Sequence, residues 1–99
     1  MRTETNRIEF KQQLTDDLEK ESIAFLNYHE GGIMYIGIDK QGNVVNVTDI
    51  YNDILKIKDR LKSNILPSCL GLFDVCVENV DGKDIIKIIF AIWFFITEY

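Results

Sequence analysis

Residues 24–39, AFLNYHEGGIMYIGID, decide the fold of this 99-residue chain. Two adjacent glycines, Gly31-Gly32, end the helical pattern before them, because glycine adopts left-handed backbone angles at no steric cost. The next six residues, IMYIGI, are too few and too rich in β-branched and aromatic side chains for a helix. Residues 33–38 are therefore predicted to form the central strand. Gly37 leaves a place on this strand where another backbone or a ligand can approach closely.

The length and the 46% content of hydrophobic residues are typical of one globular domain. A net charge of −5 and a pI near 4.7 argue against nonspecific coating of nucleic acid, since such binding needs clustered Lys and Arg side chains. Cys69 and Cys76 are too few for a disulfide scaffold or a zinc site, so we expect reduced thiols in a cytoplasmic protein. The most apolar stretch, residues 85–96, is shorter than the roughly 20 residues of a membrane helix, so no membrane contact is expected.

The remaining patterns alternate between strands and helices along the chain. The predicted elements outside the central strand are strands at 7–11, 44–47, 73–80 and from 83 onward, and helices from about 16 to 28 and from about 49 to 64. Thr48 or Asp49 can cap the second helix, and Asp81-Gly82 is a strong signal for a two-residue hairpin. The predicted fold class is therefore α+β, in the order β-α-β-β-α-β-β, with a mixed sheet and two helices on one face.

Four motifs occur in one order along the chain. They are ETNRIEFK at 4–11, AFLNYHEGGIMYIGIDKQGNVVNV at 24–47, NILPS at 64–68 and DGKDIIKI at 81–88. Together they resemble the Schlafen/Alba-like domain that is often attached to bacterial transcriptional regulators. The resemblance covers residues 4–89 and implies a single nucleic-acid-binding domain over residues 1–99, shortened at its C-terminus.

The related core of the animal Schlafens implies a second activity, a metal-dependent endoribonuclease that uses three carboxylates. The resemblance places these carboxylates on Glu4, Glu9 and Asp39, which would hold Mg²⁺ or Mn²⁺. Glu9 and Lys11 share one face of a predicted strand, so Lys11 would steady a phosphate beside the metal. Glu4 joins Glu9 only if the residues between them turn. The alternative is that Glu9 and Lys11 form a solvated pair and Asp39 merely starts a turn.

Basic residues near these carboxylates are the predicted nucleic-acid contacts. They are Arg7, Lys11 and Lys40. Four more basic residues lie within 56–62 and flank the apolar stripe of the second predicted helix. For these a solvated helix face is favoured over a phosphate-binding ridge. Gly31-Gly32 is not followed by Lys-Ser or Lys-Thr, so we expect no nucleotide site.

The C-terminal stretch FAIWFFITEY, residues 90–99, is apolar on both faces of any strand that it forms. Either the strand is central to the sheet and covered on both faces, or one face meets a second copy of the chain. Because only two helices are available to cover it, we predict a homodimer. The leading functional prediction is a DNA- or RNA-binding domain of a transcriptional regulator, which binds without cleavage. The alternatives are the Mg²⁺- or Mn²⁺-dependent endoribonuclease and a dimerisation domain without nucleic-acid activity.

Overall fold

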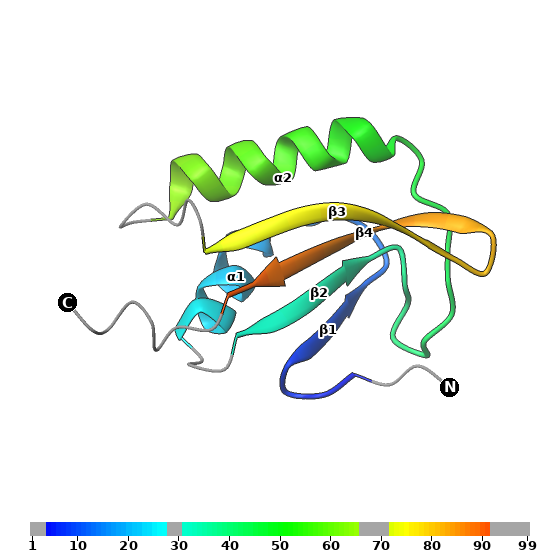
Figure 1. Cartoon of the computed structure of the whole chain (residues 1–99), viewed down its shortest axis with the longest axis horizontal. Helices are drawn as coiled ribbons and strands as arrows, with labels where there is room; N and C mark the ends of the chain where they lie inside the picture. The colour runs from blue at the N-terminus through cyan, green and yellow to red at the C-terminus, as the bar shows by residue number, and fades with distance from the viewer. Residues whose placement is uncertain (1–3, 28–30, 66–71, 92–99) are drawn as a thin grey trace.

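The computed structural model describes residues 4–27, 31–65 and 72–91, which form one sheet and two helices (Figure 1). The elements follow the chain in the order β1 (Ile8–Lys11), α1 (Leu18–Asn27), β2 (Gly32–Ile36), α2 (Ile50–Asn64), β3 (Phe73–Val80) and β4 (Lys83–Phe90). The sheet has the order β1-β2-β4-β3, in which β1 runs parallel to β2 and the other neighbours are antiparallel. The predicted α+β class and mixed sheet are confirmed.

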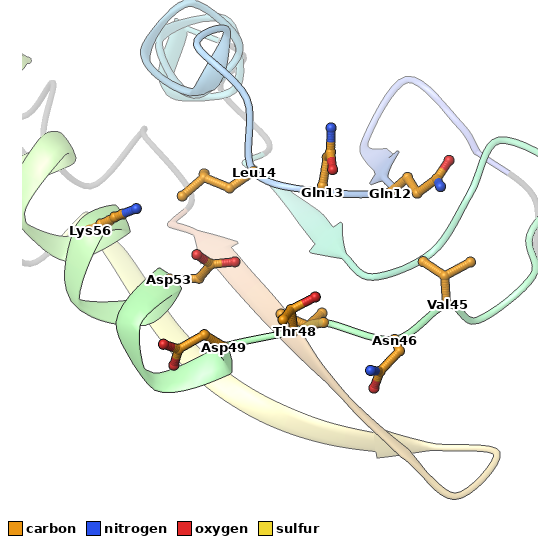
Figure 2. Close-up of a pocket in the computed structure, with 10 residues that line it drawn as sticks. Gln12, Gln13, Leu14, Val45, Asn46, Thr48, Asp49, Asp53 and Lys56 are labelled. Atoms are coloured by element: carbon orange, nitrogen blue, oxygen red, sulfur yellow. The ribbon is translucent and has the colours of Figure 1, made fainter.

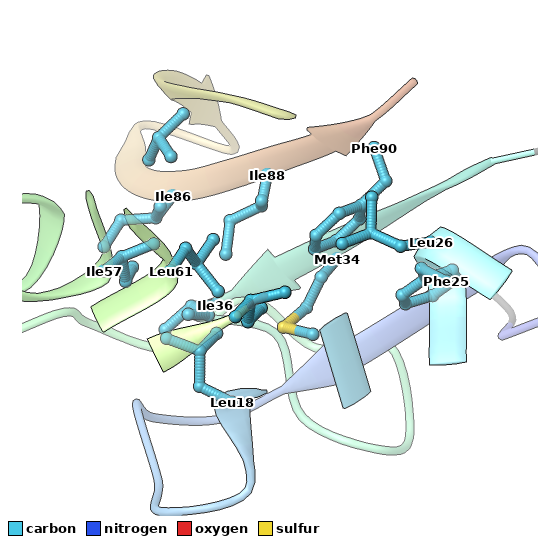
Figure 3. Close-up of a cluster of buried hydrophobic side chains, with 12 residues drawn as sticks. Leu18, Phe25, Leu26, Met34, Ile36, Ile57, Leu61, Ile86, Ile88 and Phe90 are labelled. Atoms are coloured by element: carbon cyan, nitrogen blue, oxygen red, sulfur yellow. The ribbon is translucent and has the colours of Figure 1, made fainter. Parts of the chain in front are cut away.

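Both helices pack against the same face of the sheet and form the main core with it (Figure 3). From α2, Ile57 and Leu61 are completely buried, as the spacing of the apolar stripe predicted. From α1, the ring of Phe25 stacks on that of Phe90 in β4, with centroids 5.2 Å apart. The sheet contributes Met34, Ile36, Val75, Ile86, Ile88 and Phe90 to this core.

The glycine pair before β2 is explained by close packing. A Cβ atom on Gly32 would collide with the ring of Phe25, and one on Gly31 would collide with the carbonyl oxygen of Phe90. Gly31 also has a φ of 74°, which favours glycine. These two residues therefore let the end of α1 and the start of β2 approach the end of β4.

The opposite face of the sheet carries a smaller core near the ends of β1 and β2. Phe10, Ile38 and Ile85 are buried there, with Val44 packed against them. Farther along this face no helix of the described residues covers the strands. Ile89 is 37% exposed at that end.

The central strand ends earlier than predicted because the backbone distorts at Gly37, where φ is 116°. The N–H groups of Gly37 and Ile38 both donate to the carbonyl oxygen of Lys11, at 2.7 and 3.3 Å, as in a β-bulge. Residues 44–47, predicted as a strand, form only one bridge, between Ile38 and Val44. The sheet of the described residues therefore has one strand fewer than predicted between the two helices.

Other local predictions are confirmed. Oδ1 of Asp49 accepts a hydrogen bond of 3.3 Å from the N–H of Asn52 and so caps α2. Asp81 and Gly82 both have positive φ, 54° and 78°, as the two-residue turn between β3 and β4 requires. No helix among the described residues is long and apolar enough to cross a membrane. Cys69 and residues 92–99, which include most of the apolar stretch behind the predicted homodimer, lie outside the described residues.

Candidate functional site

The segment before β1 folds back along the outer edge of that strand. Thr5 and Ile8 exchange two backbone hydrogen bonds, of 3.1 and 3.3 Å, so the chain turns between them. The turn places Oε2 of Glu4 2.8 Å from the backbone nitrogen of Phe10, whose N–H donates to it. Glu4 thus satisfies a backbone donor of an edge strand. This is the turn that the spacing of Glu4 and Glu9 required.

Glu4 and Glu9 share one cation, the ammonium group of Lys40. Nζ of Lys40 lies 2.8 Å from Oε2 of Glu4 and 2.6 Å from Oε2 of Glu9. The two carboxylate side chains are 30% and 29% exposed, and the lysine side chain is 55% exposed. We call these three residues the edge cluster. It lies at the surface and combines two negative charges with one positive charge.

Hydrogen bonds hold Glu4 and Lys40 in their charged forms. Burial alone would raise the pKa of Glu4, but hydrogen bonds from Lys40 and from the N–H of Phe10 outweigh burial and lower that pKa. Burial alone would lower the pKa of Lys40, but its hydrogen bonds to Glu4 and Glu9 outweigh burial and raise that pKa. Both groups are therefore ionised at neutral pH.

Asp39 organises its own loop. Its Oδ1 accepts hydrogen bonds from the N–H groups of Gln41 and Asn43, at 3.0 and 2.9 Å, and its Oδ2 accepts one from Nδ2 of Asn43 at 3.4 Å. This is the turn-forming role that the sequence left open as an alternative.

The three carboxylates, as arranged, do not fit a Mg²⁺ or Mn²⁺ ion. Lys40 lies between the first two, Glu4 and Glu9, and the loop uses the oxygens of the third, Asp39. In the part of the chain that the structure describes, no group of three or more His, Cys, Asp or Glu side chains is placed to hold a metal. The metal-binding and catalytic roles of Glu4, Glu9, Asp39 and Lys11 stay predictions.

Lys11 lies on the same strand face as Glu9 but pairs with α1. Its Nζ is 2.7 Å from Oε2 of Glu21, and the two side chains are 18% and 24% exposed. The other oxygen, Oε1 of Glu21, is buried without a hydrogen-bond partner among the described residues. Glu9 and Glu21 line a pocket of about 300 Å³ together with Asn6, Ala24 and Phe25. Lys11 thus compensates a largely buried carboxylate, which competes with a role in phosphate binding.

Arg7, the third predicted contact, is exposed in the turn that precedes β1. Its N–H donates to Oγ1 of Thr5 at 3.1 Å, and its carbonyl oxygen accepts the N–H of Ile33 at 2.8 Å. Its backbone is therefore anchored to β2, while the residue itself is exposed.

The basic residues of α2 behave in two ways. Lys56, Lys58 and Lys62 are exposed, as expected of a solvated helix face. Arg60 differs, because its guanidinium binds the carboxylate of Glu19 on α1 and only 24% of its side chain is exposed. Arg60 therefore joins the helices, a role that the sequence did not predict.

A polar pocket of about 360 Å³, which the sequence did not single out, lies where the chain leaves β1 and enters α2 (Figure 2). The segment that follows β1 faces the segment before α2 across it, and α2 closes one end. Its polar lining residues are Gln12, Gln13, Asn46, Thr48, Asp49, Asp53 and Lys56. Amide side chains that follow a predicted strand, and others that precede a predicted helix cap, are a sequence signal for a polar pocket. The two segments are distant in the sequence, so the pattern did not show that they lie together. Such groups can hydrogen-bond a polar ligand.

Comparison with known proteins places this architecture in a family. No curated protein and no solved structure matches the chain. The sequence model of the family described as Schlafen, AlbA_2 matches residues 4–92. The matched part includes the edge cluster, both helices and every strand of the described sheet. Since the match spans most of the 99 residues, the chain belongs to the Schlafen, AlbA_2 family.

Proposed function

We propose that this chain is a nucleic-acid-binding domain, which binds DNA or RNA without cutting it. The observation that carries the proposal is membership of the Schlafen, AlbA_2 family over residues 4–92. The resemblance of the four sequence motifs to that family implies nucleic-acid binding. It also supports the finer proposal that the domain serves a transcriptional regulator in the cytoplasm.

Arg7 and Lys40 are the nucleic-acid contacts that the geometry favours. Both residues are exposed, Arg7 in the turn before β1 and Lys40 beside Glu4 and Glu9, and 55% of the Lys40 side chain is accessible. Lys11 is a weaker candidate, because both lysines pair with carboxylates but only 18% of the Lys11 side chain is exposed. The carboxylates of the edge cluster repel phosphate groups, so we expect few phosphate contacts and a shallow dependence of affinity on salt.

Fluorescence anisotropy with labelled duplex DNA and labelled structured RNA, repeated over a salt series, tests this proposal. We expect saturable binding that weakens as the salt concentration rises. Arg7→Ala should weaken binding to every sequence and reduce the slope of log affinity against log salt by about 1, because one phosphate contact is lost.

Lys58→Ala is the matched control for Arg7→Ala. It removes one positive charge from the exposed face of α2 and should leave the affinity unchanged. If Lys58→Ala alone lowered the affinity for nucleic acid, the contacts would lie on α2, and the assignment to Arg7 would be contradicted. Failure of the wild-type protein to bind either nucleic acid would contradict the function itself.

Metal-dependent endoribonuclease activity is the second candidate, and one observation favours it. Glu4 and Glu9 meet at the edge of β1 although they are separated along the chain. In this candidate Mg²⁺ or Mn²⁺ would have to displace Lys40 before Glu4, Glu9 and Asp39 could act as its ligands, with Lys11 assisting. Incubation of structured RNA with Mn²⁺ and either the wild-type protein or Asp39→Ala tests it. Cleavage by the wild-type protein alone supports this candidate, and RNA that stays intact with both proteins contradicts it.

We also propose that the chain forms a homodimer through the sheet face that no described helix covers. Ile33 and Ile89 are partners in the register of β2 and β4, and Ile89 is 37% exposed. The mostly apolar residues 92–99 follow β4 closely in the sequence. Burial of such a face against a second copy is favourable. Dimerisation would remain as the function if nucleic acid did not bind.

A further inference from the structure

The edge cluster holds a cation of its own, and we infer that Lys40 takes the place of a divalent metal between Glu4 and Glu9. In this chain the carboxylate pair is thus a site that a lysine fills. The inference goes beyond the proposed function, because it holds whether or not the chain binds nucleic acid.

The two carboxylates converge on one point. Nζ of Lys40 is 2.8 Å from Oε2 of Glu4 and 2.6 Å from Oε2 of Glu9, which are the lengths of charge-assisted hydrogen bonds. Oε2 of Glu4 accepts a second hydrogen bond, from the N–H of Phe10 at 2.8 Å. A Mg²⁺ ion would lie about 2.1 Å from its oxygen ligands. A metal bound to these two oxygens would therefore have to displace the ammonium group.

The neighbouring carboxylates are engaged in a similar way. Asp39 accepts hydrogen bonds from the backbone N–H groups of two residues in its loop. Glu21, which lines the same pocket as Glu9, binds the ammonium group of Lys11 at 2.7 Å. Of these two carboxylates in the described structure, Glu21 is thus held by a lysine and Asp39 by a turn.

Lys40 competes with a dissolved metal from within the same molecule. It follows Asp39, whose hydrogen bonds to the loop hold this part of the backbone beside the end of β2. The ammonium group is therefore presented to the carboxylates at a high effective concentration. Its charge also repels a divalent cation. We expect Mn²⁺ to leave the edge cluster of the wild-type protein unchanged.

Removal of the ammonium group should open the site to metal. In Lys40→Ala, Glu4 is still held by the N–H of Phe10 and Glu9 by its place in β1, but no cation lies between them. Two like charges at short distance favour the binding of a cation. We expect this variant to bind Mn²⁺ about tenfold more tightly than the wild-type protein, measured as the loss of the free Mn²⁺ signal in electron paramagnetic resonance.

Three further variants make this experiment specific. Lys58→Ala changes the net charge equally and should bind Mn²⁺ as the wild-type protein does. Lys40→Ala combined with Glu9→Gln should return the Mn²⁺ affinity to the wild-type value. Lys40→Gln, which keeps a long side chain without the charge, replaces Lys40→Ala if circular dichroism shows that the alanine variant is unfolded.

Two results would overturn the inference. One is wild-type protein that binds Mn²⁺ as tightly as Lys40→Ala does. The other is a folded Lys40→Ala or Lys40→Gln single variant that gains no Mn²⁺ affinity. Thermal unfolding gives a second readout, since Mn²⁺ should raise the Tm of the Lys40→Ala and Lys40→Gln single variants and not that of the wild-type protein or the double variant. No nucleic acid is present in these measurements, so their failure is distinct from a failure of the proposed function.

Discussion

Glu19 and Arg60 join the two helices through their side chains. Nε of Arg60 donates to Oε2 of Glu19 at 2.9 Å, and a terminal guanidinium nitrogen donates to Oε1 at 2.5 Å. Nδ2 of Asn64 donates to Oε2 at 2.8 Å. These hydrogen bonds, above all those from Arg60, lower the pKa of Glu19 to about 2. The side chains of Glu19 and Arg60 are 22% and 24% exposed, so water screens their attraction only in part.

We predict that Glu19→Gln lowers the free energy of unfolding by about 1–2 kcal/mol at pH 7. The pKa of Glu19 is lower in the folded protein than its ordinary value of 4.5. Its carboxylate therefore stabilises the folded state above pH 4.5, and this stabilisation is lost as the pH falls toward 2. Urea unfolding at two pH values, one neutral and one near 3, measures the effect. The difference between the two proteins should shrink at the acidic value.

Asp59→Asn is the matched control for Glu19→Gln. It removes a carboxylate from the exposed surface of α2 and should change the free energy of unfolding by less than about 0.5 kcal/mol. A Glu19→Gln effect that stayed the same at both pH values would show that the lost stability does not come from the charge of Glu19.

The sequence predicted which residues gather at the edge of β1 better than it predicted their partners. It showed that Glu4 and Glu9 would meet if the chain turned between them, and the chain does turn. It did not show that Lys11 would bind Glu21 on α1 while Lys40 bound both carboxylates of the edge cluster. A lysine side chain is long and flexible, so the packing of distant segments decides which of several carboxylates it binds.

At the scale of the elements, Gly37 sets the end of β2. A Cβ atom there would lie 2.7 Å from Cγ2 of Ile85 and 2.9 Å from Cγ2 of Val47, and φ is 116°. We predict that Gly37→Ala lowers the free energy of unfolding, measured in urea, by about 2–4 kcal/mol through backbone strain and overpacking. Gly82→Ala is the control, with a positive φ of 78° but no atom within 4 Å of the added Cβ. It should cost about 1 kcal/mol, and equal losses in both variants would contradict the packing argument.

The bounds of an element were predicted correctly where a capping or turn residue marks its end. α2 begins after its Asp49 cap and ends at Asn64, and β3 spans the predicted residues. Residues 44–47 have the composition of a strand, but a strand also needs a partner with free hydrogen-bonding groups. The bulge at Gly37 and the loop built on Asp39 end the ladder after a single bridge. A bulge depends on the neighbouring strand, so a local pattern cannot reveal it.

At the scale of the whole molecule, both helices lie on one face of the sheet, and among the described residues no helix covers part of the other face (Figure 1). Ile89 is 37% exposed on this second face. We predict that Ile89→Lys converts the proposed homodimer into a monomer, because a charge would be buried in the interface. Size-exclusion chromatography with light scattering measures the mass. Ile23→Lys, at a residue of α1 that is 41% exposed, is the control and should keep the dimeric mass. A monomeric wild-type protein would contradict the proposal.

The net charge of −5 disfavours long-range electrostatic attraction between this protein and a nucleic acid. Lys11, Lys40 and Arg60 each have a carboxylate partner in the described structure, so these cations form no uncompensated basic groove. Binding should then depend on a small contact surface at the edge of β1 and not on long-range attraction.

The central claim is that this Schlafen, AlbA_2 domain binds nucleic acid without a divalent metal and without cutting it. The most direct measurement is a titration of labelled structured RNA and labelled duplex DNA with the wild-type protein, followed by fluorescence anisotropy in EDTA and in Mn²⁺ at matched ionic strength. Gel electrophoresis of the RNA then shows whether it was cut. We predict the same affinity in both buffers and intact RNA. Binding that needs Mn²⁺, cleaved RNA, or no binding to either nucleic acid would contradict the claim.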